Sequence, residues 1–358
     1  MPIGRFAAGK RYGNSLVDSC EFFSARRGAL VLKTLVQPLG GTEPASGALT
    51  LETVICTRNR ASLLARALDA LVEQAKVVPQ LSVAVVDNMS EDDTANVVAS
   101  ASAQIPGRIR MLRCDKLGAN CARNLALNSS TSELIAYIDD DAVPEQHWAA
   151  AILHTFQAVG PSLAAVAGAI DPLWGGPVPD WLTPDLTAYY SVLDLGPIRR
   201  PITPHESFVS ANVAFRRDAL LAVGGFHEQL GRVGASLFSN DEVFTCRALQ
   251  EREWTIVYEP AVRVRHNVAA DRLTWTWLSQ RLYQQGRSDV VMWALLAPGR
   301  SRLTHLKDAF TYCLRWAWNL RRFLGRSSTE SRKTALCSFY LLAGRATGSA
   351  ELAINPRC

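Results

Sequence analysis

The chain has 358 residues, 48% of them hydrophobic, and can therefore build one large or two ordinary globular domains. No stretch approaches the roughly eighteen consecutive apolar residues of a membrane span, and the eight cysteines form no C-x-x-C pair and no zinc-like spacing with histidine. The net charge of +5 is unevenly distributed, because residues 271–358 hold fourteen Lys and Arg against five Asp and Glu.

Residues 1–48 are expected to form a poorly ordered extension, with an accessory strand at 29–32 as the alternative. They contain Arg, Lys, Asp and Glu without a continuous apolar core, so we expect no secretory signal peptide. Several cysteines lie in apolar stretches further along, where reduced thiols are usual. We therefore predict a reducing compartment, the cytoplasm.

A repeating pattern begins at residues 53–56, a short β-rich stretch followed by polar residues and by apolar residues at helical spacing. Asn59 or Ser62 is expected to cap this first helix. Strands are predicted again at 81–86, 109–113 and 134–138, each ending in a polar loop. Successive strand–loop–helix units of this kind predict a parallel sheet with its polar loops on one edge.

Three adjacent carboxylates, Asp139, Asp140 and Asp141, follow the last of these strands. The carboxyl end of a parallel strand is where open α/β sheets bind ligands. Like charges this close repel and raise one another's pKa, so a divalent cation, Mg²⁺ or Mn²⁺, is the economical explanation. The alternative is an acidic loop in which one aspartate caps a helix that begins near Glu145.

The other loops carry groups that a nucleotide diphosphate would use. Asp87 follows the second strand and can accept hydrogen bonds from a base or ribose, while Arg58 and Arg123 can face phosphate. Alternatively, Asp87 caps a helix and the arginines are solvated. No G-x-G-x-x-G follows the first strand and no P-loop motif is present, which argues against dehydrogenases and P-loop enzymes.

Four segments in this order, 53–60, 85–90, 118–124 and 138–141, resemble the successive motifs of family 2 glycosyltransferases of the GT-A fold. The resemblance runs from about residue 50 to 290. It implies an α/β fold, a mostly parallel Rossmann-like sheet flanked by helices, with a helical C-terminal extension. It also implies that Mg²⁺ or Mn²⁺ is a cofactor. The implied nucleotide-sugar-binding residues are Thr57, Arg58, Asn59, Asp87, Gly118, Arg123, Asp139 and Asp140, and the implied metal ligands are Asp139, Asp141 and His266.

Catalytic residues are predicted where Asp241 and Glu242 begin a helix. Their alternative role is to compensate the helix dipole. In related enzymes an acidic pair at this place supplies the general base, and Arg247, six residues beyond Asp241, also matches. Because Asn240 stands where many members have Glu, the base is either carboxylate, and we prefer Asp241.

The middle of the chain contains further strand-like stretches and a proline-rich segment. Strand-like residues occur at 164–168, 207–217, 256–260 and 262–266, the last ending at His266, which could otherwise be a packed or solvated histidine. Residues 171–204 hold seven of the seventeen prolines and several Trp and Tyr, which predicts an extended surface excursion. Its rings could stack on a sugar or pack on the body.

The chain is predicted to be helical and rich in Trp from Leu273 onward. A stripe of apolar residues follows helical spacing at 303, 306, 310, 313, 317, 320 and 324, with Lys307, Arg315, Arg321 and Arg322 off it. This helix either packs on the body or lies on an anionic membrane. We divide the chain into an extension (1–48), a catalytic domain (49–270, with a nucleotide-binding half to 145) and a basic helical region (271–358).

The predicted function is inverting transfer of a sugar from a nucleotide-diphosphate sugar donor to an acceptor hydroxyl, in polysaccharide or glycolipid synthesis. The protein is expected in the cytoplasm, with peripheral membrane contact through the basic helices and no nucleic-acid partner. One alternative is a nucleotidyltransferase, which should have a Gly-rich phosphate loop where residues 57–60 have no glycine. The other is an inactive nucleotide-sugar-binding protein of the same fold.

Overall fold

The computed structural model describes residues 48–234, 236–324 and 329–355, and within the C-terminal helices it describes the side chains up to Arg321 and from Lys333. The predictions for residues 1–47, including the strand at 29–32, lie outside the described residues. The domain boundaries at residues 48 and 270 stay a prediction.

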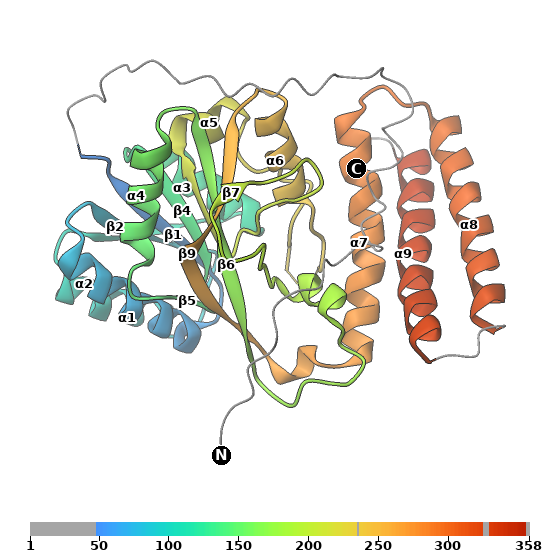
Figure 1. Cartoon of the computed structure of the whole chain (residues 1–358), viewed down its shortest axis with the longest axis horizontal. Helices are drawn as coiled ribbons and strands as arrows, with labels where there is room; N and C mark the ends of the chain where they lie inside the picture. Colours follow the sequence, from blue (N-terminus) through green and yellow to red (C-terminus); the bar gives the residue numbers. More distant parts are fainter. Residues whose placement is uncertain (1–47, 235, 325–328, 356–358) are drawn as a thin grey trace. The chain divides into compact units, whose positions relative to one another are not determined.

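In the described part of the chain, nine strands form one mixed sheet in the order β3-β2-β1-β4-β8-β6-β9-β5, with β7 on β9 (Figure 1). Strands β1, β2, β3 and β4 pair in parallel, as do β6 and β9, whereas β8, β5 and β7 run antiparallel to their neighbours. The strands are β1 (Leu51–Thr57), β2 (Leu81–Asp87), β3 (Ile109–Arg113), β4 (Leu134–Asp139), β5 (Ala142–Pro144), β6 (Leu163–Trp174), β7 (Arg200–Pro201), β8 (Asn212–Arg216) and β9 (Thr255–Val268).

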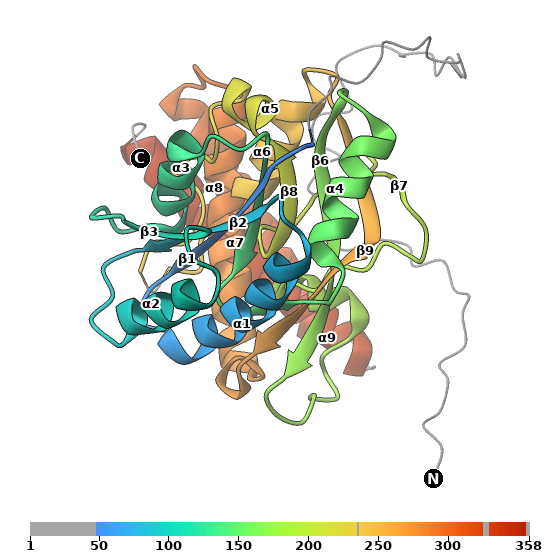
Figure 2. The ribbon, with the colours of Figure 1, turned by 90° about the vertical axis from the view of Figure 1, so that its left-hand side faces the viewer.

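Helices cover both faces of this sheet, which is why the central strands are apolar throughout rather than alternating (Figure 2). One core layer includes side chains of α1, α2 and α4, and the other includes side chains of α3, α5 and α6. The helices are α1 (Ala61–Val77), α2 (Thr94–Gln104), α3 (Ala119–Ser129), α4 (Trp148–Val159), α5 (Arg217–Ala222), α6 (Asp241–Gln250), α7 (Trp275–Leu296), α8 (Arg302–Leu324) and α9 (Thr329–Ile354). The predicted α/β fold with a helical C-terminal region is confirmed.

The predicted cap of α1 is wrong. Arg60 is the N-cap residue, without a side-chain capping bond. Asn59 instead accepts a hydrogen bond from the Glu91 amide at 2.8 Å, and its own amide donates to Ser90 at 3.0 Å. The residue therefore ties the loop after β1 to the loop after β2.

Two strand predictions were too short. β6 continues to Trp174 through Pro172, because its later residues pair with β9 on one side, while β8 covers the other side only over Ala165–Ala167 and Leu193 bridges Ile170 beyond it. The two predicted strands at 256–260 and 262–266 are one strand, β9, with a bulge opposite Gly168 and Ala169.

The aromatic excursion after β6 packs on α7. Ring centroids of Trp181 and Trp275 lie 5.4 Å apart, and those of Tyr190 and Trp277 lie 4.8 Å apart. Tyr190 belongs to a 3₁₀ helix, Pro184–Tyr190, and is buried. The rings of Trp181 and Tyr190 therefore pack on the body, and stacking of the excursion on a sugar stays a prediction.

The C-terminal helices pack side by side in the spatial order α7, α9, α8, so that the last helix lies between the other two (Figure 1). The predicted apolar stripe of α8 does not face them: Leu303 is 69% exposed and Phe310 is 65% exposed. His305 is buried on the opposite face of the helix. The interpretation that this stripe packs on the body is thus wrong. Among the described residues, no helix has the length and apolar character that a membrane crossing requires.

Candidate active site

The polar loops gather at one edge of the sheet because three parallel strands end in register. Thr57 at the end of β1 pairs with Asp87 at the end of β2, and the preceding Cys56 pairs with Asp139 at the end of β4. Thr57 and Asp87 are buried, whereas the Asp139 side chain is 35% exposed. The edge predicted from the strand–loop–helix order is therefore the edge that carries the carboxylates.

Strand β9 brings His266 to the acidic triplet. Ala142, directly after the triplet, pairs antiparallel with His266, and the Asn267 amide donates to the Asp141 carbonyl at 2.8 Å. Nε2 of His266 lies 3.2 Å from Oδ1 of Asp141, and both side chains are buried. One ligand atom each from Asp139, Asp141 and His266 lie within 4.8 Å of one another. The three residues predicted as metal ligands are thus together.

These donors fit a divalent cation. Among the described residues, Oδ1 of Asp141 has no hydrogen-bond partner apart from the His266 ring nitrogen beside it, so a buried anionic oxygen is left with free coordination capacity. Burial opposes its ionisation, but the hydrogen bond and charge of His266, with the charges of Arg60 and Arg272, hold the pKa of Asp141 below its usual range. Two carboxylates and an imidazole are ligands of a kind that Mn²⁺ or Mg²⁺ sites use.

Arg60 is a site residue that the sequence did not single out. Its NH1 donates to Oδ1 of Asp140 and to Oδ2 of Asp141, both at 3.0 Å. Asp140 also accepts from the Thr57 hydroxyl at 2.8 Å. Burial raises the pKa of Asp140 to about 6, although the charge of Arg60 and this hydrogen bond act to lower it. Arg58, predicted to face phosphate, is exposed. The only sequence signal for Arg60 was its place in the polar loop after β1.

Arg123 of α3 joins the triplet to the second acidic group. Its NH1 donates to Oδ2 of Asp241 at 2.9 Å, its NH2 donates to the Ser210 hydroxyl at 2.8 Å, and NH2 also lies 3.6 Å from Oδ1 of Asp139. The Ser210 hydroxyl in turn donates to Glu242 at 2.8 Å. Since protein groups engage this guanidinium, a direct contact between Arg123 and phosphate stays a prediction.

The two carboxylates at the start of α6 share this one cation and therefore titrate together. Burial, and then repulsion by Glu242, raise the pKa of Asp241 well above its usual range despite Arg123. Burial also acts on Glu242, but the hydrogen bond from Asp241 and the charge of Arg123 lower its pKa. Asp241 is therefore the more strongly basic of the two, while Glu242 is the less buried.

The remaining predicted residues line the loops after β2 and β3. Asp87 accepts a hydrogen bond from the Ser90 amide at 2.8 Å. Asn88, which the sequence analysis did not assign, donates to the carbonyls of Cys114 and Lys116 and accepts from the Gly118 amide at 2.9 Å. Gly118 has φ 143°, a conformation that favours glycine, and begins α3.

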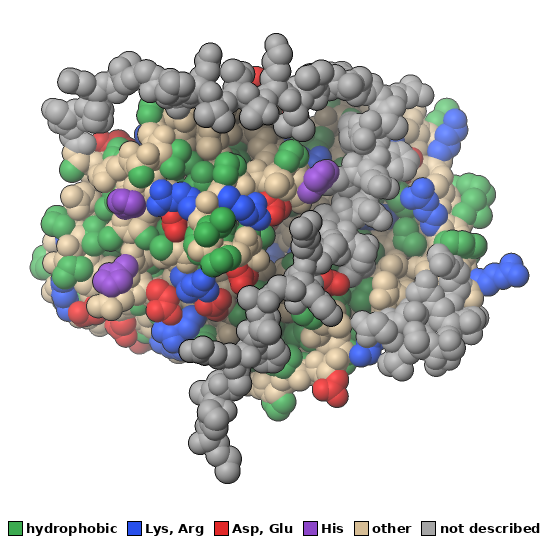
Figure 3. All heavy atoms as spheres, viewed as in Figure 1, with side chains coloured by type: hydrophobic (Ala, Val, Ile, Leu, Met, Phe, Trp, Pro, Cys, Tyr) green, Lys and Arg blue, Asp and Glu red, His purple; other side chains and the backbone are tan. Residues whose placement is uncertain are grey.

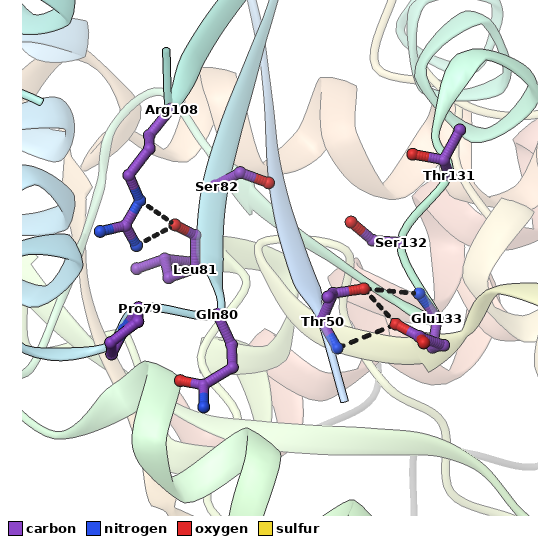
Figure 4. Close-up of a pocket in the computed structure, with 9 residues that line it drawn as sticks. All are labelled: Thr50, Pro79, Gln80, Leu81, Ser82, Arg108, Thr131, Ser132 and Glu133. Atoms are coloured by element: carbon purple, nitrogen blue, oxygen red, sulfur yellow. Dashed lines mark hydrogen bonds between the residues drawn. The ribbon is translucent and has the colours of Figure 1, made fainter. Parts of the chain in front are cut away.

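A separate hollow of about 430 Å³ lies at the opposite edge of the sheet, where β1 and β2 begin (Figure 4). Its charged groups are already satisfied. Arg108 donates to backbone carbonyls, including that of Leu81, and Glu133 accepts from the amide and hydroxyl of Thr50. This hollow therefore offers no free charged group for catalysis, in contrast to the carboxyl-end edge.

Comparisons with known proteins agree with this geometry. The family model described as "Glycosyltransferase like family 2" matches residues 50–287. The succinoglycan biosynthesis protein ExoM of Rhizobium meliloti (strain 1021) is 28% identical over 294 residues, covering 81% of this chain and 85% of that protein. The glucosyl-dolichyl phosphate glucuronosyltransferase of Haloferax volcanii is 30% identical over 207 residues, covering 55% of this chain and 64% of that protein.

A solved structure shares the fold. The mannosyltransferase PcManGT from Pyrobaculum calidifontis, in complex with GDP-Man and Mn²⁺, aligns with a TM-score of 0.57 at 18% identity. The alignment covers 87% of this chain and 89% of that one. At this identity the similarity concerns the arrangement of strands and helices.

Proposed function

Because the chain belongs to glycosyltransferase family 2 and is a sugar-transferring enzyme, we propose that it is a metal-dependent, inverting transferase. Its donor is a nucleotide-diphosphate sugar and its acceptor is a hydroxyl group. The observation that carries the proposal is one edge of the sheet at which Asp139, Asp141 and His266 gather and Arg123 links them to Asp241. A nucleotidyltransferase would share the sheet but has no need of this second acidic pair.

In this proposal Asp139, Asp141 and His266 hold Mg²⁺ or Mn²⁺. A cation bound there would neutralise the negative charge that develops on the diphosphate leaving group. Asp87, at the adjacent strand end, accepts hydrogen bonds from the base or ribose. Arg60 keeps Asp140 and Asp141 in place, because it donates to both carboxylates.

Asp241 acts as the general base. Its raised pKa makes Asp241 the stronger proton acceptor of the two carboxylates, since the pKa of Glu242 is lowered. The acceptor oxygen attacks the anomeric carbon from the face opposite the leaving diphosphate, the bond to the diphosphate oxygen breaks, and the proton passes to Asp241. A single displacement inverts the configuration and requires no covalent enzyme intermediate.

A role in polysaccharide or glycolipid synthesis is supported by the names of two relatives, a succinoglycan biosynthesis protein and a transferase that acts on glucosyl-dolichyl phosphate. The protein would act on the cytoplasmic side, where nucleotide sugars are the donors. One of the similar proteins is a glucuronosyltransferase and another is a mannosyltransferase. We therefore propose only the class of donor and the hydroxyl nucleophile.

The direct test is a panel of nucleoside-diphosphate sugars, with and without Mn²⁺, in a thermal unfolding assay. A ligand that binds only the folded state raises the melting temperature, so one sugar nucleotide should raise it with Mn²⁺ and much less with EDTA. That sugar nucleotide should then serve as donor to an acceptor pool, with inversion checked by NMR. Metal-independent protection, or a product of retained configuration, would contradict the proposal.

We also propose that α8 binds an anionic membrane surface. The exposed large apolar side chains of the helix are Leu303, Leu306, Phe310, Leu314, Trp318 and Leu320. Leu314 and Trp318 were not in the predicted stripe, and the six residues are called the stripe from here on. Arg302, Lys307, Arg315 and Arg321 of this helix are exposed. Figure 3 shows hydrophobic and basic side chains next to one another on the side of the molecule where α8 lies. The one acidic residue of the helix, Asp308, is half-buried and accepts from Arg300 at 2.8 Å. A second copy of this face would bring like charges together, whereas acidic lipid complements them.

Co-sedimentation with vesicles tests this contact. Binding should require acidic lipid, weaken with salt, and fall when Lys307, Arg315 and Arg321 are changed to Glu, since each cation near such a surface contributes about 1 kcal/mol. The matched control changes the exposed Arg66, Arg113 and Arg252 to Glu, which alters the net charge by the same amount away from α8. An equal loss of vesicle binding in both triple variants would contradict the proposal, and so would binding to vesicles that contain only neutral lipid.

A further inference from the structure

We propose that the buried ion pair between Asp289 of α7 and Arg345 of α9 positions the catalytic carboxylates, because it holds Asn240, the residue before Asp241, in its left-handed conformation. The inference rests on the proposed function, in which Asp241 and Glu242 act on the acceptor. It gives the C-terminal helices a part in catalysis although they lie outside the sheet. Asp289 and Arg345 are positioning residues, since they act through Asn240.

Asn240 is bonded to α7 through both atoms of its amide. Its Nδ2 donates to Oδ1 of Asp289 at 2.9 Å, and its Oδ1 accepts from Nε2 of Gln285 at 2.7 Å. The preceding Ser239 is held in the same way, since its amide donates to the Ser288 hydroxyl and its own hydroxyl donates to Gln285. Residues 239 and 240 are therefore anchored to one face of α7 immediately before α6 begins.

The anchor matters because Asn240 has φ 73°. A left-handed residue other than glycine is uncommon, and neighbouring contacts have to maintain it. This conformation sets the direction in which α6 starts, and thus the direction of the Asp241 and Glu242 side chains. From the other side Arg123 holds the Asp241 carboxylate at 2.9 Å. The catalytic pair is thereby fixed between a bond to α3 and a backbone anchored on α7.

Asp289 can serve as this anchor because Arg345 neutralises it. Nε and NH2 of Arg345 donate to Oδ2 of Asp289 at 2.9 and 2.7 Å, which leaves Oδ1 for Asn240 and Gln285. The Asp289 side chain is 5% exposed, and such a carboxylate would be costly without a cation.

The helices that carry this pair meet backbone to backbone. A Cβ atom added at Gly286 of α7 would lie 2.1 Å from the Leu341 carbonyl oxygen, and one added at Gly344 of α9 would lie 2.0 Å from the Tyr283 carbonyl oxygen. This close crossing places Arg345, the residue after Gly344, directly against Asp289. The crossing thus fixes the distance over which the arginine acts.

The arrangement also explains an amide at position 240. A carboxylate there would face Asp289 and could not donate to it, so Asn240 and Asp289 form a matched pair of donor and acceptor. Combining Asn240→Asp with Asp289→Asn exchanges the amide and the carboxylate. The hydrogen bond between the two positions should be preserved, because the new amide at 289 can donate to the new carboxylate at 240. This reciprocity allows the anchor to be tested apart from any direct contact that Asn240 makes with substrate.

The experiment is a double-mutant cycle of Asn240→Asp, Asp289→Asn and the combined exchange, measured by steady-state transfer. Asn240→Asp should lower kcat by up to about a hundredfold, the scale of a misplaced catalytic group, with little change in KM for the donor. The exchange variant restores the hydrogen bond but leaves Arg345 without its carboxylate partner, so it should recover only part of that loss. Arg345→Gln, which leaves Asp289 without its cation, should lower kcat on its own. Gln285→Met, which leaves the Asp289–Arg345 pair intact, should also lower kcat.

The matched control is Glu351→Gln. Glu351 accepts from Arg287 at 2.8 and 2.9 Å and also joins α7 to α9, but it is exposed and does not contact residues 239 to 242. Its kcat should stay within about twofold of the wild type, as for other exposed ion pairs. An equal loss of kcat in this control, no recovery in the exchange variant, or an unchanged kcat in Arg345→Gln would overturn the inference. Failure of the wild type to transfer any sugar would instead overturn the proposed function.

Discussion

The carboxyl-end edge of the sheet and helix α8 depart from ordinary burial in opposite directions. At the edge, Asp140, Asp141 and Asp241 are buried, whereas along α8 side chains as large as Phe310 and Trp318 are 65% and 60% exposed. Buried carboxylates and a contiguous exposed apolar stripe are both uncommon in a folded chain. Both therefore require a reason beyond stability.

The two regions differ in how the unfavourable burial of carboxylates, or the unfavourable exposure of apolar side chains, is compensated. The edge supplies its own partners, since Arg60, Arg123 and His266 lie within 3.2 Å of the buried carboxylates. Such ion pairs offset the cost of desolvating the carboxylates without adding much net stability. The presence of buried carboxylates here therefore indicates a functional role. On α8 no described residue covers the stripe, and each such side chain forgoes part of the roughly 1.5–3 kcal/mol that full burial would contribute. The edge thus contains its compensation, and the stripe requires a partner.

The largest expected effect is at the edge. Asp141→Ala should abolish transfer and remove the Mn²⁺-dependent rise in melting temperature with sugar nucleotide, because it deletes a ligand that no other described residue replaces. Circular dichroism should show a folded protein. Asp218→Ala, which removes an 89% exposed carboxylate, is the control and should leave transfer unchanged. Normal turnover of the Asp141 variant would mean that the buried triplet serves structure alone.

A smaller effect separates the two carboxylates of α6. Asp241→Asn should lower kcat by about a hundredfold, the usual scale for a positioned base, while donor binding with metal persists. Since the pKa of Asp241 is raised, the wild-type kcat should fall as pH drops through that value, where the base becomes protonated, and the variant should lack this limb. A larger loss in Glu242→Gln would exchange the two roles.

The smallest effect is expected on α8. Phe310→Ser should change the free energy of unfolding by no more than about 0.5 kcal/mol, as for other exposed positions. Leu282→Ala, at a fully buried position of α7, should lower it by about 2–5 kcal/mol. Urea unfolding measures both. A cost for the Phe310 variant near that of the Leu282 variant would mean that the stripe is covered in the folded chain.

Local sequence pattern was sufficient for the longer strands and the helices of the catalytic region, because periodicity and polar loops are short-range signals. The short strands β5 and β7 were not predicted. It was also sufficient to place the acidic triplet at a strand end and Asp241 and Glu242 at a helix start. The predicted strand ends were wrong where pairing with a distant strand determines them. The later residues of β6, for example, are strand because they pair with β9.

Only the tertiary structure decided which side chains meet. The loop after β1 turns so that Arg60, and not Arg58, reaches Asp140, and pairing of β5 with β9 brings His266 from 125 residues away to Asp141. The link from Asn240 to Asp289 likewise joins segments 49 residues apart. The stripe of α8 was visible in the sequence, but its exposure depended on which helix face α9 covers. A sequence pattern specifies what a side chain can do, whereas its direction and its neighbours depend on contacts between distant parts of the chain.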